Sequence, residues 1–145
     1  PRSTQGVSSA ASDVYKRQDL DDTMVLSKAF MDLGNNIIIF PEGSRGEPGK
    51  MQRFRKGAVK FSMGLDVPIL PAAIIGADKA WPKGEKWMQS VPITVKILPK
   101  MDPPKSDKLS ESAFNKSLSK LTKELETNIT KAVKELEKDA SSEIS

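Results

Sequence analysis

The sequence predicts an α/β fold, in which a partial mixed sheet has flanking helices and is followed by a long amphipathic C-terminal helix. Three observations predict it. Short apolar runs at residues 36–40 and 72–75 alternate with segments of helical periodicity. Residues 91–98 show the two-residue period of a strand. From Leu109 to about Lys138, apolar residues recur every three or four positions, as on one face of a helix.

Residues 1–18 are rich in serine, alanine and glutamine and show no sustained period, which predicts a disordered or non-native lead-in. The run from Ser8 to Gln18 also resembles a translated library adapter, so we set it apart from the fold. We therefore expect the native sequence to begin near Asp19 and the chain to be truncated.

A helix is expected from Leu20 to Gly34, because apolar residues fall near a 3.6-residue period and acidic residues gather at its start. Residues 36–40 follow as a compact apolar run, rich in isoleucine and too short for a helix. We expect a buried strand here, which ends at Pro41.

The loop after this run has the composition of an anion-binding site. Gly43, Gly46 and Gly49 permit positive φ angles and close approach of a ligand, and successive N–H groups of such a loop can converge on a negative oxygen. Arg45 offers a planar fork that fits phosphate. By composition alone, a solvated surface turn without a ligand is the alternative.

A second helix is expected from about Arg53 to Met63, with Gly64 as its terminator. Gly57 in its first turn costs about 1 kcal/mol of helix propensity relative to alanine. Either a close backbone or ligand contact, or the packing of the helix against the strand, would explain this glycine.

Residues 67–76 are nearly continuous apolar chain, and we expect an extended entry through Pro71 and a buried strand over 72–75. The loop over 78–90 places Trp81 and Trp87 among lysines, which suits a membrane interface or a surface loop whose indoles cap the core. Residues 91–98 are expected to form a strand at or near the sheet edge. Residues 101–108 then read as a linker.

The C-terminal segment, residues 109–145, is expected to be an amphipathic helix and a tail. Its apolar stripe comprises Phe114, Leu118, Leu121, Leu125, Ile129, Ala132 or Val133, and Leu136. We expect this stripe, over 109–138, to pack on its own domain; a helix partner in a coiled coil and a lipid surface are the alternatives.

Composition limits the function. The 145 residues contain neither cysteine nor histidine, which removes disulfides, thiolate metal sites and the commonest general base. The net charge of +4 suits an anionic ligand or lipid surface, although excess lysine also serves solubility alone. No apolar run is long enough to span a bilayer. Nucleic-acid binding is not expected, because no recognised fold signature accompanies the charge.

Phe-Pro-Glu-Gly-Ser-Arg at 40–45 is followed by Phe-Arg-Lys-Gly at 54–57, and the apolar stretch at 67–76 comes next. In this order, the motifs resemble the third and fourth sequence blocks of the glycerolipid acyltransferases, the acylglycerol-phosphate (lysophosphatidate) acyltransferase family. The resemblance covers roughly residues 20–98. It implies a partial acyltransferase-type sheet in a domain over residues 19–100.

The resemblance also implies roles for individual residues. Arg45 would grip the acceptor phosphate, Glu42 would order the loop or orient an acceptor hydroxyl, and Lys56 would be a supporting cation. The residues assigned to substrate binding are Glu42, Gly43, Ser44, Arg45, Lys56 and Gly57. Those assigned to the lining of the acyl and acceptor site are Phe40, Pro41, Pro68 and Pro71. Where Gly46 stands, family members often have serine.

The implied reaction transfers an acyl group from an acyl thioester, acyl-CoA or acyl carrier protein, to the hydroxyl of a lysophospholipid such as lysophosphatidate. No cofactor or metal is implied beyond these substrates. In the family the base is a histidine with an aspartate beyond it, and this chain has no histidine, so we expect it to be inactive alone. The resemblance implies membrane association on the cytoplasmic side. The alternative is a non-catalytic module that binds a phospho-ligand or lipid headgroup.

Overall fold

The computed structural model describes residues 22–105 and 109–142, and the chain divides into two compact units, residues 1–38 and 39–145. In the first unit, residues 22–32 are helical, which confirms the described part of the first predicted helix. The chain turns after it at Gly34, whose φ of 84° favours glycine. The lead-in over residues 1–18 lies outside the described residues.

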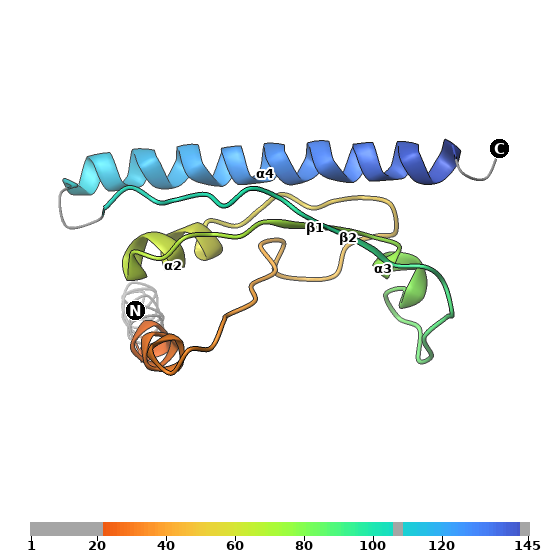
Figure 1. Cartoon of the computed structure of the whole chain (residues 1–145), viewed down its shortest axis with the longest axis horizontal. Helices are drawn as coiled ribbons and strands as arrows, with labels where there is room; N and C mark the ends of the chain where they lie inside the picture. Colours follow the sequence, from red (N-terminus) through yellow and green to blue (C-terminus); the bar gives the residue numbers. More distant parts are fainter. Residues whose placement is uncertain (1–21, 106–108, 143–145) are drawn as a thin grey trace, which may run out of the picture. The chain divides into compact units, whose positions relative to one another are not determined.

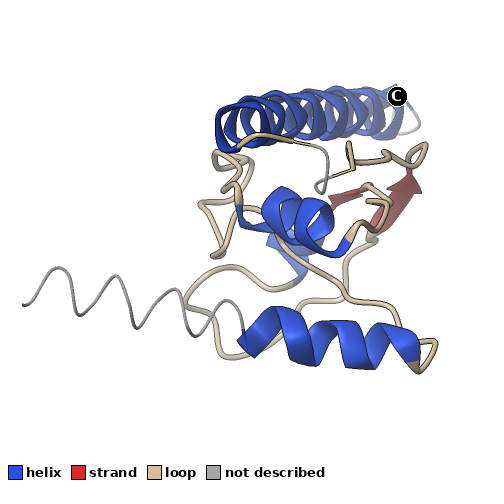
Figure 2. Cartoon of the chain, turned by 90° about the vertical axis from the view of Figure 1, so that its left-hand side faces the viewer, coloured by secondary structure: helices blue, strands red, loops and turns tan. Residues whose placement is uncertain are grey.

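The second unit contains three helices and two strands within its described part (Figures 1 and 2). In chain order they are α2 (Gly57–Leu65), β1 (Ala72–Ile75), α3 (Ala77–Ala80), β2 (Thr94–Ile97) and α4 (Glu111–Ser142). The predicted strand over 72–75 is confirmed, and β1 has the same first and last residues as the prediction. The predicted helix over 109–138 is also confirmed, and it continues to Ser142.

The β1 and β2 strands form an antiparallel pair, in which Ala73 lies opposite Lys96. Beyond this pair, Ile69 and Met101 exchange backbone hydrogen bonds of 2.9 and 2.8 Å and prolong the ladder. The described sheet is therefore two-stranded and antiparallel, where a mixed sheet was expected. β2 is shorter than predicted, because Pro92 and Pro99 on either side of it have no N–H to donate.

The prediction of a buried strand over residues 36–40 is wrong. This segment has no regular secondary structure, and Ile38 and Phe40 are 82% and 70% exposed. A strand needs the N–H and C=O groups of a neighbour, and no described segment pairs with this one. The isoleucine run supplied the apolar pattern of a strand but not the partner.

The limits of α2 also differ from the prediction. The helix begins at Gly57 because the chain before it is tied to the glycine loop, where the Arg55 N–H donates to the Pro41 carbonyl at 2.8 Å. The terminator is Asp66, not Gly64. Asp66 has a left-handed φ of 53°, which aspartate tolerates better than most residues, and its N–H caps the Ser62 carbonyl.

The core of the second unit lies where α4 packs along β1 and against α2 (Figure 1). Val59 and Met63 of α2 and Ala73 of β1 are fully buried. From α4 the buried apolar side chains are Leu118, Leu121, Leu125, Ile129 and Ala132. The predicted packing of the C-terminal helix on its own domain is therefore observed.

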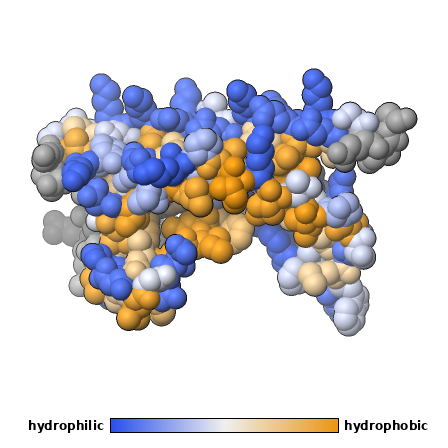
Figure 3. All heavy atoms as spheres, viewed as in Figure 1, coloured by the Kyte–Doolittle hydropathy of each residue, from blue (hydrophilic) through white to orange (hydrophobic). Residues whose placement is uncertain are grey.

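The other face of the strand pair is apolar and exposed. Ile74, Val95 and Ile97 alternate with residues that face the core and are 42%, 54% and 59% exposed. Hydrophobic surface accordingly lies beneath the hydrophilic edge that α4 forms (Figure 3). Among the helices of the described ranges, none is both long and apolar enough to cross a membrane.

Candidate functional site

Two hydrogen-bonded turns shape the glycine loop. The Gly43 N–H donates to the Phe40 carbonyl at 3.0 Å, and the Lys50 N–H donates to the Glu47 carbonyl at 3.1 Å. The second turn has Pro48 and Gly49 at its central positions, with a φ of 73° at Gly49, which is the pattern of a type II turn. The loop is thus defined by local chemistry at both ends.

Glu42 ties the two sides of the loop together. Its Oε2 accepts a hydrogen bond of 2.7 Å from the backbone N–H of Gln52, and the contact is partly buried. A carboxylate that accepts a backbone N–H forms a stronger bond than a neutral acceptor. This geometry supports the loop-ordering role expected of Glu42.

Arg55 lies directly against the loop. Gly43 has a φ of 76°, and a Cβ atom placed on it would lie 3.0 Å from the Arg55 Nε. Gly46 is similarly confined, since a Cβ there would lie 3.0 Å from both the Gln52 side-chain nitrogen and the Lys50 carbonyl. These two glycines allow the close approach that side chains would prevent.

Arg45 is held by an aromatic ring instead of a carboxylate. Its guanidinium carbon lies 5.0 Å from the centroid of the Trp81 ring, within the range of a cation–π contact. The Trp81 Nε1 in turn donates to the Glu85 carbonyl at 2.9 Å, which orients the ring. Within the described ranges no carboxylate forms an ion pair with Arg45, so its charge is available to an anion.

A second contact joins the glycine loop to α3. The Gly49 N–H donates to Asp78 Oδ2 at 2.9 Å. The glycine loop is therefore attached at Arg45 and Gly49 to the segment that begins with α3. The Ser44 hydroxyl is exposed and makes no hydrogen bond with the described part of the chain, so it can donate to a ligand.

The structure does not bring all of the expected substrate-binding residues together. Lys56 Nζ donates to Ser119 Oγ of α4 at 2.9 Å, and Arg55 is instead the cation beside Gly43. A Cβ on Gly57 would meet nothing within 4 Å, so neither close packing of α2 nor a contact within the described chain requires glycine there. The roles of Lys56 and Gly57 in substrate binding stay predictions.

The four residues expected to line the acyl and acceptor site differ in environment. Phe40 is exposed and Pro41 is half-buried, and their carbonyls accept hydrogen bonds within the loop. Pro71 is buried, and its carbonyl accepts from the Leu98 N–H at 2.9 Å. Pro68 is exposed.

Sequence reasoning missed three parts of this site: Arg55, Asp78 and the contact of Trp81 with Arg45. Arg55 belongs to the Phe-Arg-Lys-Gly motif at 54–57, so the sequence could have suggested it as a second cation of the site. The sequence around Asp78 and Trp81 did not indicate which residues they contact, because their partners come from a distant loop.

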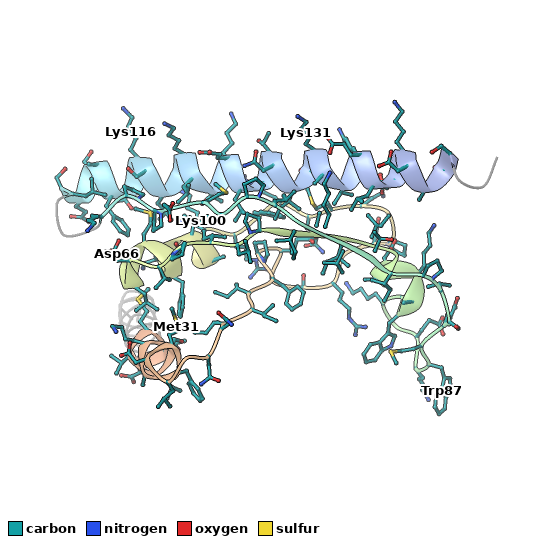
Figure 4. All side chains as sticks on the ribbon, in the orientation of Figure 1. Met31, Asp66, Trp87, Lys100, Lys116 and Lys131 are labelled. Atoms are coloured by element: carbon teal, nitrogen blue, oxygen red, sulfur yellow. The ribbon has the colours of Figure 1, made fainter. Side chains whose placement is uncertain are left out.

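The two tryptophans of this segment do not cap the core. Trp81 is 46% and Trp87 is 82% exposed, and Trp87 stands at the tip of its loop (Figure 4). The membrane-interface interpretation of this segment stays a prediction.

A wide groove of about 1210 Å³ opens between the segment over 53–56 and α4, and we call it the basic groove. Seven of its fourteen lining residues are basic and two are acidic. The basic ones are Arg53, Arg55, Lys56, Lys123, Lys131, Lys134 and Lys138. As for metals, residues 22–105 and 109–142 contain no cluster of three or more potential ligands among Asp, Glu, His and Cys.

The known proteins that this chain resembles all carry the name acyltransferase. Residues 7–75 match the family model described as Acyltransferase. The match begins within the lead-in over residues 1–18, so the boundary near residue 19 stays a prediction. The 1-acyl-sn-glycerol-3-phosphate acyltransferase of Limnanthes douglasii is 42% identical over 64 residues, which cover 44% of this chain and 23% of the relative.

The enzyme of the same name from Cocos nucifera is 32% identical over 90 residues, covering 62% of this chain and 28% of the relative. Among solved structures, the 1-acyl-sn-glycerophosphate (LPA) acyltransferase PlsC from Thermotoga maritima superposes with a TM-score of 0.62 at 28% identity. That match covers 81% of this chain and 44% of the solved one. The chain thus spans about a quarter of the length of these curated relatives and under half of the solved structure.

Proposed function

Because the chain belongs to the glycerolipid acyltransferase family, of which it carries one part, we propose that it contributes the acceptor-binding part of a lysophosphatidate acyltransferase. The reaction would move an acyl group from an acyl thioester, acyl-CoA or acyl carrier protein, to the free hydroxyl of lysophosphatidate. The name that the relatives share supports this acceptor. As part of such an enzyme, the chain would work at a membrane surface on its cytoplasmic side.

The observation that supports this proposal most directly is that Arg45 is exposed and has no carboxylate partner among the described residues. Its guanidinium is exposed, lies over Trp81 and pairs with no described carboxylate, so it can bind a phosphate bidentately. The Ser44 hydroxyl lies beside it in sequence and would add a donor. Arg55, against Gly43, would supply a second positive charge.

The chain would hold the acceptor without activating it. Acyl transfer to an alcohol needs a base that removes the hydroxyl proton, and the family resemblance implies a histidine in that role. The sequence contains no histidine. We therefore propose that this chain does not catalyse acyl transfer by itself.

Calorimetric titration with a short-chain, soluble lysophosphatidate tests the binding role. We expect binding that weakens about tenfold in Arg45→Ala, or about 1.4 kcal/mol, and less in Arg45→Lys, which keeps the charge but loses the fork. Arg53→Ala, which removes an exposed arginine that lines the basic groove, is the matched control. Equal losses in both alanine variants, or equal affinity for a monoacylglycerol without phosphate, would refute the proposal.

An acylation assay with acyl-CoA and lysophosphatidate tests the second part. We expect no product above the rate without protein, and measurable product would show that another group serves as the base.

The histidine-free sequence also favours a second candidate, a non-catalytic module that binds a phospho-ligand or lipid headgroup. The two candidates differ in the gene upstream of Asp19. An in-frame histidine followed by an aspartate in the family's spacing supports the enzyme, whereas a native start codon near residue 19 supports the binding module.

A further inference from the structure

The lysines of α4 lie along the basic groove and continue beyond it. Of the ten α4 residues that line the groove, four are lysines, four carry hydroxyls and two are acidic. Lys116, Lys120, Lys123, Lys131, Lys134 and Lys138 follow one another at spacings of three, four and eight residues, which places them on one side of the helix. All six are exposed, and we call them the lysine ridge. Lys116 and Lys131 stand on the side of α4 away from the strands (Figure 4).

The charges of α4 are segregated although the helix as a whole is neutral, with six lysines and six acidic residues. By helical position the acidic residues lie beside the lysine ridge or toward the core, and none interrupts it. A helix that needs only solubility requires exposed charge but no single sign along one line. The ridge therefore gathers like charges at an electrostatic cost, which a negatively charged partner would relieve.

The opposite wall of the basic groove adds Arg53, Arg55 and Lys56 to this surface. Within the described residues, no ion pair involves any of the seven basic side chains that line the groove. Of the two acidic lining residues, Glu135 is already paired with Lys96 at 3.0 Å. The groove thus presents an excess of positive charge, with basic residues on both walls.

The lining chemistry decides what kind of partner fits. The hydroxyls of Ser119, Thr122, Thr127 and Thr130 donate to carbonyls of their own helix. The groove therefore offers charge but few of the precisely placed donors and apolar walls that small-molecule sites use. Recognition by charge alone, spread over about 28 Å of helix from residue 119 to 138, suits a protein surface.

A lipid surface fits less well. Interfacial binding needs apolar side chains that enter the bilayer. The apolar residue that lines the groove, Phe54, is only 6% exposed and belongs to the core. A planar surface would also not reach both walls of a groove.

We propose that the basic groove docks an acidic segment of a soluble protein. Arg55 lines the groove, and its side chain also lies against Gly43 of the candidate acceptor loop, so a partner seated in the groove would lie close to that loop. The choice of partner rests on the proposed function: the acidic, soluble protein that takes part in such a reaction is the carrier protein that holds the acyl thioester.

Fluorescence anisotropy of a labelled, acidic holo acyl carrier protein, titrated with this chain, tests the proposal. We expect saturable binding that weakens as salt rises from about 0.05 to about 0.3 M, because exposed charges are screened. The variant Lys131→Gln, Lys134→Gln, Lys138→Gln should weaken binding about tenfold. Its helix content, measured by circular dichroism, should be unchanged, since all three side chains are exposed.

The matched control is Lys79→Gln, Lys83→Gln, Lys86→Gln, which removes the same charge from exposed lysines outside the groove. We expect its affinity for the carrier protein to stay within about twofold of the unchanged chain. Equal weakening in the two triple variants would show a general charge effect and overturn the proposal. Absence of carrier binding would overturn it as well.

Two further titrations separate the alternatives. Anionic phosphatidylglycerol vesicles should bind the groove variant as well as the unchanged chain, and a selective loss would assign the groove to membranes instead. Soluble lysophosphatidate should bind both triple variants equally. Loss of acceptor binding throughout, with carrier binding intact, would refute the proposed function and leave the docking surface standing.

Discussion

The guanidinium of Arg45 lies over the ring of Trp81, with 5.0 Å between the guanidinium carbon and the ring centroid. Arg45 comes from the glycine loop and Trp81 directly follows α3, and a hydrogen bond from the Gly49 N–H to Asp78 of α3 joins the same two segments a second time. The conformation of the glycine loop therefore depends on the segment after β1. Arg45 keeps an oriented charge without a carboxylate that would neutralise it.

Trp81 should report ligand binding at Arg45. In a Trp87→Phe variant, Trp81 is the sole tryptophan, and soluble lysophosphatidate should change its emission because the ligand alters the charge above the ring. The complementary Trp81→Phe variant, which keeps Trp87, should respond little. If the double variant Trp87→Phe, Arg45→Ala shows the same change in Trp81 emission on titration, the signal does not come from binding at Arg45 and the prediction is wrong.

Gly43→Ala should destabilise the chain and weaken phosphate binding. A left-handed φ costs a non-glycine residue about 1–2 kcal/mol, and the new Cβ would also displace the Arg55 side chain. Gly84→Ala is the control, because Gly84 also has a positive φ but an added Cβ would meet nothing within 4 Å. In urea denaturation both variants should lose stability, whereas only Gly43→Ala should lose affinity for lysophosphatidate.

Removal of the Glu42 carboxylate should open the loop locally. The Gln52 N–H donates to Glu42 Oε2, and a hydrogen bond to a charged group contributes about 1.5–3 kcal/mol. In Glu42→Ala, hydrogen exchange at the Gln52 amide should become at least roughly tenfold faster. Glu47→Ala removes a carboxylate that bonds the exposed Lys50 and should leave this amide unchanged. Equal exchange in both variants would contradict the bond.

Met63→Ala should cost about 2–5 kcal/mol of the free energy of unfolding, because Met63 of α2 is fully buried in the core and its truncation leaves a cavity. Met88→Ala makes the same chemical change at a side chain that is 74% exposed and should cost less than about 0.5 kcal/mol. Similar costs in urea denaturation would show that Met63 is not buried in the core as described.

Glu135 should titrate below its ordinary range. The hydrogen bond and charge of Lys96 lower the pKa of Glu135, with a smaller effect from Lys131. A lowered folded pKa adds stability above the unfolded pKa, and this stability is lost as the pH falls through the folded pKa. The contribution is small because the pair is exposed. In an NMR titration, Lys96→Gln should raise the pKa of Glu135, whereas Lys100→Gln, whose partner is Asp102, should not.

Local pattern predicted the elements that a single segment can specify. The apolar run over 72–75 became β1, and the stripe from Leu118 to Ala132 became the buried face of α4. Side-chain spacing alone determines which residues share a face of a helix, so this stripe could be read directly. The turns around Gly43 and Gly49 also follow from their prolines and glycines.

The sequence by itself determined three helical segments, over residues 22–32, in α2 and in α4, and that Arg45 stands in a glycine-rich loop; the short helix α3 lies where a loop over 78–90 was expected. Only the tertiary structure decided that residues 36–40 form no strand, because pairing depends on a neighbour that an apolar run does not supply. It also decided that Trp81 holds Arg45, that Arg55 lies beside Gly43, and that Lys56 turns to Ser119. These contacts join residues distant in the chain, where spacing carries no information about which side chains meet.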